Sequence, residues 1–351
     1  MRLNHLCAAL AVILAAPAAA QQAATLPQLA DQLEYAMVAG EYRPLPRADD
    51  FVYTENGNAL KPCDGMWNTL SAVAGTDPRL YPRAKVLDYR VEIVDGDDLV
   101  RLVETDENTV QGVALLRVKG QGGKLVRVDM LPVREEFSGS RGGTVTLLQP
   151  TLPATMDGAK VSSADPLFAS GVARRATRKS LIEAADSYLD AMLANRSAGA
   201  HLAPDCVRKD NGQPVTGVAK AALLDPGKPL FRPFALGCAA QLDSGYYSNI
   251  RQVRDRRYWA DPARGLVLVQ AQMDVPGTVL SFTAPGYGTI NYPGPRGPVA
   301  TNGQQFEGRI LDNMISPLRM SSVFLFKVDG RAIRRIDAFY RGAPYGWRLG
   351  W

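Results

Sequence analysis

Two segments of the chain carry apolar side chains at helical spacing on one face. In residues 180–195 these positions are Leu181, Ala184, Ala185, Tyr188, Ala191 and Met192. Residues 29–38 show a weaker form of the same pattern. An extended segment follows each, at residues 50–55 and 205–210, and both extended segments end at an Asn-Gly pair, which is typical of a tight turn. The pattern predicts a helix, a strand and a turn, twice.

The two segments are copies of one sequence. Residues 29–60 and 184–215 align without a gap at an offset of 155 residues. The shared residues include Ala30/Ala185, Asp31/Asp186, Ala36/Ala191, Met37/Met192, Asp50/Asp205 and Asn56-Gly57/Asn211-Gly212. So long a period is not that of a solenoid and indicates a duplicated domain.

Alternating apolar and polar residues follow in each copy and predict strands. In the first copy we expect strands at residues 89–94, 99–104, 113–118 and 124–130. In the second copy we expect them at residues 253–259, 266–274, 323–328 and 332–339. Each copy is therefore predicted to be α+β, with helical structure packed on a strongly bent antiparallel sheet.

The copies also set the expected domain boundaries. The segments are domain 1 at 24–137, a linker rich in Gly, Ser, Thr and Pro at 138–172, and domain 2 at 173–351. Residues 284–317 interrupt the second copy as a long inserted loop, and loops of this length are usually disordered or functional. Its Tyr287, Tyr292 and Phe306 suggest a lid or a packing flap.

The first 20 residues have the pattern of a secretion signal. Arg2 supplies the positive charge, Leu6 to Ala16 form a short apolar stretch, and Ala18-Ala19-Ala20 precede Gln21 as a cleavage site. No run is long enough to predict a membrane span. We expect a periplasmic or secreted protein of about 330 residues, a length suited to two domains.

The formal net charge of +5 raises the question of nucleic-acid binding. Basic residues cluster at 174–179 and 254–257, but they lie beside acids or a helix start and carry no nucleic-acid module. Solvated surface explains them better, and no nucleic-acid partner is expected.

The sequence lacks the residue patterns that several classes of enzyme require. His201 is the only histidine after the predicted signal, and no nucleophile motif accompanies it. The cysteines and this histidine lack the spacing of a zinc site, and no glycine-rich phosphate loop opens a helix. We expect neither a metal nor a nucleotide cofactor.

Three cysteines remain after the predicted signal, and export makes a disulfide plausible. Cys206 aligns with Phe51, so the first copy has no counterpart for it. A Cys206–Cys238 bond would be private to domain 2 and would leave Cys63 as an unpaired, buried thiol. Pairing of Cys63 across the domains is the alternative.

A leading helix, an Asp-rich strand start and a final hairpin resemble the NTF2-like (SnoaL-like) superfamily, whose cone-shaped domains enclose a pocket. The second copy is similar to the narrower, uncharacterised DUF8021 type. The matching segments are Leu202-Ala203-Pro204-Asp205-Cys206, Gly237-Cys238-Ala239-Ala240-Gln241-Leu242-Asp243, Arg254-Asp255-Arg256-Arg257-Tyr258, residues 326–330, and Pro344-Tyr345-Gly346 with Gly350-Trp351. This resemblance implies two tandem cone-shaped domains but supplies no activity.

Ketosteroid isomerase and scytalone dehydratase have a similar fold, and their chemistry suggests where to look. The isomerase places its general base at the end of the first strand, and Glu55 and Asp210 match that position. Both enzymes use a tyrosine on the first helix, for which domain 2 offers Tyr188 and domain 1 offers Leu33. The isomerase's second acid would fall at Ser322 or Ala114, so the match is partial.

The first functional hypothesis is an exported, cofactor-independent lyase, isomerase or cyclase working in the cavity of domain 2. A carboxylate in an apolar cup can take a proton beside a carbonyl, and a tyrosine hydroxyl can stabilise the oxyanion. The predicted catalytic residues are Tyr188, Asp210 and Asp186. Arg256 or Arg257 would orient an anionic or carbonyl-containing small molecule. Tyr258, Tyr246 and Glu55 are further predicted substrate-binding residues.

The alternative is a non-catalytic ligand-binding or scaffold protein. Tyr188 then belongs to the core, Glu55 and Asp210 belong to turns, and the shared Asp31 and Asp186 make a helix-to-sheet contact. In both hypotheses domain 1 pairs with domain 2 within the chain, because this fold often dimerises through its open sheet. Homodimerisation of the whole chain is a further option.

Overall fold

A computed structural model describes most of the two predicted domains. It covers residues 23–40, 42–62, 64–67, 86–107, 110–134, 166–219, 229–279, 281–291, 297–301, 304–308 and 317–347. The predicted signal segment, Cys63, Tyr292 and most of the predicted linker lie outside these residues.

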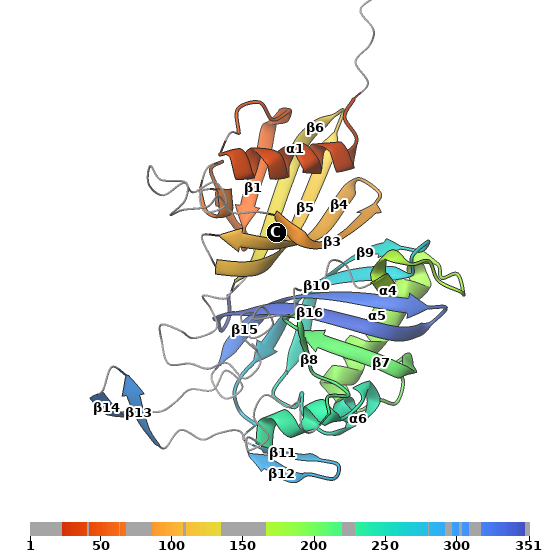
Figure 1. Ribbon diagram of the computed structural model, residues 1–351, viewed down its shortest axis with the longest axis vertical. Helices are drawn as coiled ribbons and strands as arrows, with labels where there is room; N and C mark the ends of the chain where they lie inside the picture. The colour runs from red at the N-terminus through yellow and green to blue at the C-terminus, as the bar shows by residue number, and fades with distance from the viewer. Residues whose placement is uncertain are drawn as a thin grey trace, which may run out of the picture.

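The first half of the chain begins with a helix, and strands follow it (Figure 1). Its elements are α1 (Leu26–Ala39), β1 (Arg47–Glu55), β2 (Asn58–Leu60), β3 (Val86–Asp95), β4 (Asp98–Glu107), β5 (Val110–Gln121) and β6 (Lys124–Arg134). All the strands predicted from the sequence are present, and most are longer than expected.

The second half repeats this order with additions. Its helices are α4 (Pro166–Ala169), α5 (Arg178–Ala194), the 3₁₀ helix η3 (Pro229–Ala235) and α6 (Cys238–Asp243). Its strands are β7 (Leu202–Asp210), β8 (Gln213–Pro214), β9 (Gln252–Asp261), β10 (Leu266–Val275), β11 (Ser281–Ala284), β12 (Gly288–Asn291), β13 (Gly297–Thr301), β14 (Gln304–Gly308), β15 (Leu318–Asp329) and β16 (Ala332–Pro344).

The two large sheets have the same topology. The strand order is β2-β1-β6-β5-β4-β3 in the first and β8-β7-β16-β15-β10-β9 in the second. In each sheet the first long strand pairs in parallel with the last one, and a register shift interrupts both pairings. The other pairings are antiparallel, so each half is a helix on a mixed, bent sheet, and the α+β prediction is confirmed.

The helices α1 and α5 begin and end in the same way. Thr25 and Thr177 close capping boxes at the N-termini, which satisfies backbone N–H groups that have no partner within the helix. Gly40 and Asn195, which are equivalent at the repeat offset, end the helices in the left-handed conformation.

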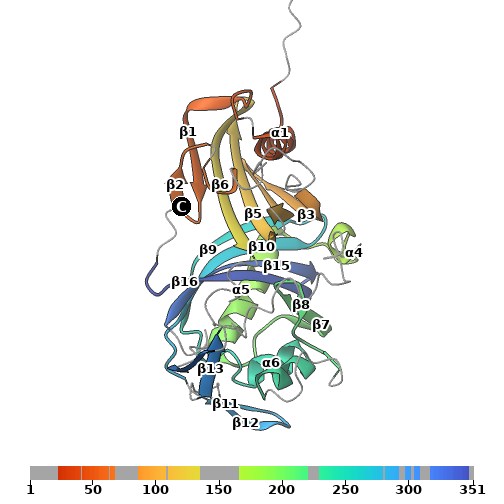
Figure 2. The same cartoon turned by 60° about the vertical axis from the view of Figure 1, so that its left-hand side comes forward.

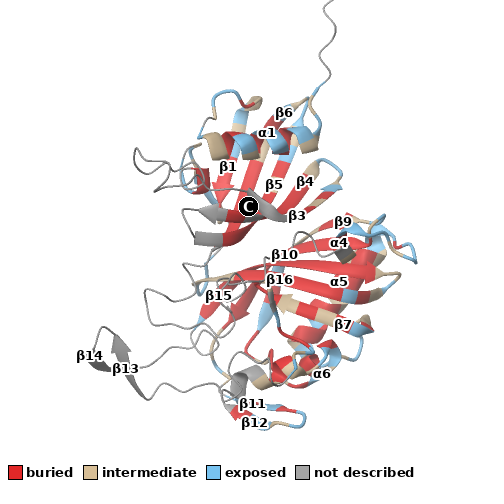
Figure 3. Ribbon diagram, viewed as in Figure 1, coloured by how far each residue is buried: buried red, intermediate tan, exposed pale blue. Residues whose placement is uncertain are grey.

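The molecule has four layers, with the two sheets back to back between the helices (Figure 2). α1 packs on the outer face of the first sheet, and α5 packs on the outer face of the second. A separate apolar cluster joins the inner faces: Val91, Ile93, Val100, Leu102, Val113, Leu115, Leu131 and Val133 meet Phe168, Trp259, Leu266, Leu268, Val323, Leu325 and Phe339. Figure 3 shows the buried residues concentrated in the central strands of both sheets.

Equivalent strands face each other across this interface, as in a symmetric dimer. β3 contacts β9, and β6 contacts β16. The turn between β3 and β4 adds polar contacts, since Asp95 accepts hydrogen bonds from Arg178 Nε at 2.9 Å and from Ala260 N at 3.1 Å. The Trp259 indole donates to Asp98 at 3.2 Å.

The inserted segment contains strands, where the sequence predicted an irregular loop. β11 pairs with β12 and β13 pairs with β14, each in a short antiparallel hairpin. Phe282, Ala284 and Ile290 of the first hairpin are buried in the core of domain 2, and Tyr287 packs against that core. The β13–β14 hairpin stands away from the body in Figure 1. No helix among the described residues is long and apolar enough to span a membrane.

Candidate functional site

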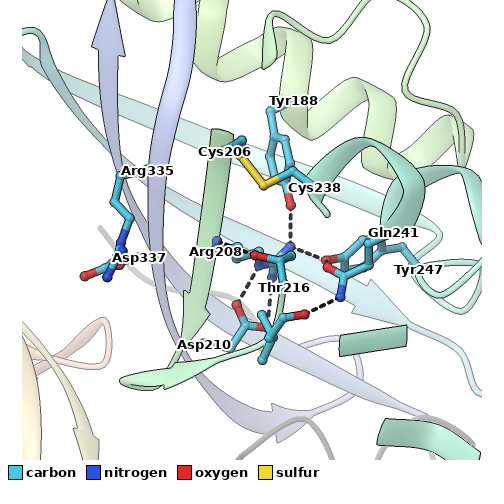
Figure 4. The surroundings of a disulfide bond; sticks show 11 residues. Tyr188, Cys206, Arg208, Asp210, Thr216, Cys238, Gln241, Tyr247, Arg335 and Asp337 are labelled. Carbon is cyan, nitrogen blue, oxygen red and sulfur yellow. Dashed lines mark hydrogen bonds and ion pairs between the residues drawn. A yellow bond between two sulfur atoms is a disulfide. The ribbon is translucent and has the colours of Figure 1, made fainter. Parts of the chain in front are cut away.

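Arg208 is the centre of a closed polar network inside domain 2 (Figure 4). It lies on β7, where alternation places Cys206, Arg208 and Asp210 on the buried face of the strand. Its Nη1 donates to the hydroxyls of Tyr188 and Tyr247, both at 2.6 Å. The guanidinium also lies over the rings of Tyr188, Tyr247 and Phe324, at 5.0–6.0 Å from their centroids.

Asp210 is the counter-ion of Arg208. Its Oδ1 accepts from Arg208 Nε at 2.6 Å, and its Oδ2 accepts from Arg208 Nη2 at 3.1 Å. The hydroxyl of Tyr340 donates to Oδ2 at 3.1 Å. Asp210 is 2% exposed and Tyr188 is 1% exposed, so both predicted catalytic groups are buried and are joined through Arg208.

The predicted disulfide is confirmed, and it holds one wall of this network. Cys206 of β7 is bonded to Cys238, the first residue of α6, and the alternative pairing of Cys63 with either of them is therefore wrong. α6 also carries Gln241, whose Oε1 accepts from the Tyr247 hydroxyl at 2.6 Å. Gln241 Nε2 donates to the carbonyl of Val215 at 2.5 Å, which holds the amide that binds Tyr247 in place.

Burial and the charges of Arg208 and Asp210 act together on the pKa values of these groups. Burial alone would lower the pKa of Arg208, but the charge of Asp210 and the surrounding phenols raise it well above its usual value. Burial raises the pKa of Tyr247, although the nearby Arg208 charge opposes that shift. Burial and then the negative charge of Asp210 raise the pKa of Tyr340. Both tyrosines therefore stay neutral in the folded protein at physiological pH.

Asp186, the third predicted catalytic residue, lies in a different cluster. It accepts from Arg256 Nη1 at 2.7 Å and from the Tyr258 hydroxyl at 2.5 Å, on the face of α5 that meets β9. Burial and this hydrogen bond raise the pKa of Tyr258. Asp31 makes the corresponding contact in domain 1, with Arg101 at 2.9 Å. Both aspartates thus bind a helix to its sheet, as the alternative interpretation predicts.

The remaining predicted binding residues of domain 2 are also dispersed. Arg257 lies among Arg117, Arg127 and Asp129 of domain 1, where burial and then the charge of Arg117 lower its pKa. Tyr246 is 4% exposed and packs edge-on against Phe234, Tyr247 and Phe282. The structure therefore brings Tyr188 and Asp210 together in the interior between α5, α6 and the bent sheet, which we call the cup of domain 2. Tyr246 packs against the wall of this cup. The other predicted residues, Asp186, Arg256, Arg257 and Tyr258, lie apart from it.

Glu55 occupies the position in domain 1 that Asp210 occupies in domain 2. It is 7% exposed, and its Oε2 accepts from the backbone N–H of Met66 at 2.7 Å. The residue equivalent to Arg208 is Tyr53, whose ring packs edge-on against Trp67 at 5.9 Å. The cup of domain 1 is therefore filled by aromatic and apolar side chains around one carboxylate.

Sequence reasoning missed Arg208, Tyr247 and Tyr340. One signal was available for Arg208, since it stands two residues before Asp210 in a predicted strand and must share its face. Tyr247 lies beyond α6 in a segment with no clear period. Tyr340 comes directly after the predicted end of the last strand, which the structure extends to Pro344.

A cavity of about 320 Å³ lies between the two domains. Domain 1 contributes the turn from β1 to β2, and domain 2 contributes the ends of β15 and β16 with the tail beyond them. The lining residues are Asn56, Asn58, Ser321, Arg341, Gly342, Ala343, Pro344 and Trp347. Within the described ranges no cluster of three or more His, Cys, Asp or Glu residues could hold a metal ion.

Comparison with known proteins finds one family match for the second domain. Residues 174–340 match the family model described as Domain of unknown function (DUF8021), which confirms the predicted resemblance. A search of curated proteins finds no match. Both halves have the arrangement that the sequence predicts, a helix on a bent six-stranded sheet.

Solved structures with a similar arrangement include two described as a "putative polyketide cyclase". The one from Xanthomonas campestris pv. campestris is 18% identical, covers 47% of this chain and 92% of its own, and has a TM-score of 0.26. The one from Silicibacter sp. TM1040 is 14% identical, covers 46% and 90%, and has a TM-score of 0.25. An NTF2-like protein of unknown function from Cytophaga hutchinsonii is 11% identical, covers 32% and 91%, and has a TM-score of 0.24.

Proposed function

We propose that this chain is an exported, non-catalytic binding protein that holds a small molecule in the cavity between its two domains. The observation that carries the proposal is the closed network in domain 2, in which the predicted general base already bonds to Arg208. In this proposal the closed interiors of the two domains stabilise the fold, and the cavity at the junction between the domains binds the ligand.

A general base must reach the proton that it removes. Asp210 uses both carboxylate oxygens to accept hydrogen bonds from Arg208 and Tyr340, and it is 2% exposed. A substrate would have to displace Arg208 and leave its charge buried without a partner, which is costly. These contacts favour a structural role for the Tyr188–Asp210 pair.

The junction cavity has the features of a small ligand site. Its volume of about 320 Å³ is at the lower end of the range for ligand pockets, about 300–1,000 Å³. Its lining combines two amides, a hydroxyl and a guanidinium with the aromatic side chain of Trp347. Because both domains supply residues, the cavity exists only when the domains are paired, which gives the duplication a function.

The proposal is tested by a thermal-shift screen of the mature chain against keto acids, sugars, sugar acids, aryl alcohols and steroids, with turnover assayed for each hit. Every hit is then measured on Asn56→Leu and on the paired replacement Arg208→Met with Asp210→Leu. We expect binding without turnover that is lost in Asn56→Leu and kept in the paired replacement. Turnover that depends on Asp210, or binding lost only in the paired replacement, would contradict the proposal.

A proton-transfer enzyme of the lyase, isomerase or cyclase kind is the second candidate. One observation favours it: the phenols of Tyr188 and Tyr247 bind one cationic centre, Arg208, and the phenol of Tyr340 binds its counter-ion Asp210. If Arg208 swung away, the phenol hydroxyls could donate to a developing oxyanion, and Asp210 could accept a proton. This candidate predicts turnover that falls at least tenfold in Tyr188→Phe, with the fold of the variant unchanged in circular dichroism.

A further inference from the structure

The amide of Asn56 differs from its counterpart in the other domain. Asn56 and Asn211 are equivalent in the repeat, both follow the first strand of their sheet, and both are left-handed, with φ of 52° and 46°. Their backbone N–H groups make equivalent bonds to the last strand, to Met130 O at 2.9 Å and to Ala338 O at 2.7 Å. The two turns are therefore superimposable in their backbone contacts.

The side chains of these asparagines do not make equivalent bonds. Asn211 Oδ1 accepts from the backbone N–H of Tyr340 at 3.0 Å, and its Nδ2 donates to the carbonyl of Tyr340 at 3.2 Å. The strand register places Pro132 of domain 1 where Tyr340 stands in domain 2. Proline has no N–H to donate. Asn56 Oδ1 accordingly has no hydrogen-bond partner in the described part of the chain, although it is buried.

A buried acceptor without a donor is unusual in a folded protein and costs about 1–3 kcal/mol. Asn56 lines the junction cavity, so a ligand that occupies the cavity lies beside its amide. A ligand hydroxyl there would supply the donor that Pro132 lacks. Asn58 lies two residues further on and adds a second amide to the same wall.

The opposite wall carries a positive charge and a hydroxyl. Ser321 of β15 pairs directly with Arg341 of β16, so both side chains leave the same face of the sheet. Ser321 is 3% exposed, and Arg341 is half-buried. A guanidinium presents several N–H groups in one plane and matches a carboxylate in two parallel hydrogen bonds.

The aromatic wall is held in place from inside the domain. Arg319 donates to the carbonyl oxygen of Trp347 and pairs with Asp274 at 2.6 Å, and both charged residues are almost fully buried. Trp347 itself is 40% exposed. An exposed indole fixed beside polar groups offers a flat apolar face to a ring that is polar at its edge.

We infer that the junction cavity takes a single-ring sugar acid, a polyhydroxylated ring with one carboxylate. The hydroxyls bind Asn56 and Asn58, the carboxylate pairs with Arg341, and the ring lies on Trp347. The cavity volume suits one ring. This inference rests on the proposed function and adds the chemistry of the ligand.

The test is isothermal titration calorimetry of the mature chain with D-galacturonate, D-glucuronate, D-galactose and acetate. We expect a uronate to bind more tightly than galactose, and acetate to bind least. Asn56→Leu and Trp347→Ala should each weaken uronate binding by about 10- to 100-fold. Arg341→Gln should remove the preference for uronate over galactose. Tyr345→Ala, an exposed aromatic of the same tail outside the lining, is the matched control and should change nothing.

The outcomes separate this inference from the proposed function. If no uronate binds, while another compound from the screen binds in a way that Asn56→Leu abolishes, the sugar-acid inference is overturned and the binding site stands. If galactose binds as tightly as uronate to the unmodified chain, the role of Arg341 is overturned. If no compound depends on Asn56 or Trp347, both are overturned. Thermal melting of each variant confirms that it is folded.

Discussion

The interiors of the two domains differ in the side chain that stands two residues before the buried carboxylate. Domain 1 carries Tyr53 where domain 2 carries Arg208, and each lies two residues before a buried carboxylate. In domain 1 that carboxylate, Glu55, accepts from a backbone N–H. In domain 2, Asp210 neutralises a fully buried guanidinium.

This contrast shows that a duplicated fold can keep a buried carboxylate at the same position while its bonding partner changes from a backbone N–H to a guanidinium. The cup of domain 1 is closed by apolar and aromatic contact around Trp67, and the backbone N–H of Met66 donates to the acid. The cup of domain 2 is closed by a charge pair, and Tyr188, Tyr247, Tyr340 and Gln241 satisfy the atoms that remain. The charged interior is the more sensitive of the two, because losing one partner leaves a buried charge uncompensated.

The largest expected effect follows from neutralising each carboxylate in turn. Asp210→Asn leaves Arg208 charged and unpaired, and we expect a loss of about 3–5 kcal/mol in the free energy of unfolding. Glu55→Gln keeps an oxygen that can accept from Met66 N, and we expect a loss of about 1 kcal/mol. Guanidinium chloride denaturation of both variants measures the difference. Equal losses would mean that the charge pair of domain 2 stabilises its domain no more than the Glu55 contact with Met66 N stabilises domain 1.

The disulfide is the next difference between the domains, since Phe51 stands where domain 2 has Cys206. The Cys206–Cys238 bond closes a loop with a sequence separation of 32, which predicts about 3–4 kcal/mol of stabilisation from loop closure. Replacing both cysteines with serine should therefore lower the stability of domain 2 by this amount. A reducing agent added to the unmodified protein should have the same effect. Unchanged denaturation in both experiments would contradict the assigned bond.

A smaller effect is expected at Gly65, which closes the cup of domain 1. It has φ of +61°, and a Cβ there would lie 2.1 Å from Glu55 Oε2. Gly96 has φ of +64° and open space around it. Gly65→Ala should cost about 1–3 kcal/mol more than Gly96→Ala, because both variants share the backbone strain and only the first displaces Glu55. Similar melting temperatures for the two variants would show that Glu55 is free to move.

The smallest effect is in the alkaline pH dependence. Burial raises the pKa of Tyr247 and Tyr340 in the folded protein above the value of about 10 in the unfolded chain. The unfolded chain therefore releases these protons first, and stability that is complete below pH ~10 falls as the pH rises further. Denaturation midpoints measured between about pH 8 and 11 should decline less steeply for Tyr247→Phe. A steeper decline would reverse the sign of this linkage.

The sequence predicted the fold well because the repeat imposes it. The offset of 155 residues located both helices and both first strands, and alternation located the remaining long strands. The β11–β12 and β13–β14 hairpins were missed because their strands are only four or five residues long and lie among Gly and Pro. Short strands show too little alternation to be recognised.

The site was predicted less well, for two physical reasons. The sequence singles out Tyr188 and Asp210 but not Arg208, since sequence alone does not show that a charge is buried with its partner. The junction cavity depends on strand register. Pro132 takes the place relative to Asn56 in domain 1 that Tyr340 takes relative to Asn211 in domain 2. This equivalence is visible only when the strands of both sheets are paired.

The claim that a charge pair closes the interior of domain 2 is tested most directly by the coupling energy between Arg208 and Asp210. A double-mutant cycle compares Arg208→Met, Asp210→Leu and the paired replacement by chemical denaturation. We expect each single variant to be strongly destabilised and the paired replacement to recover about 2–3 kcal/mol relative to their sum, because it leaves no unpaired charge. Additivity within about 0.5 kcal/mol would contradict the account, since the two residues would then contribute independently and the cup of domain 2 would not be closed by their pairing.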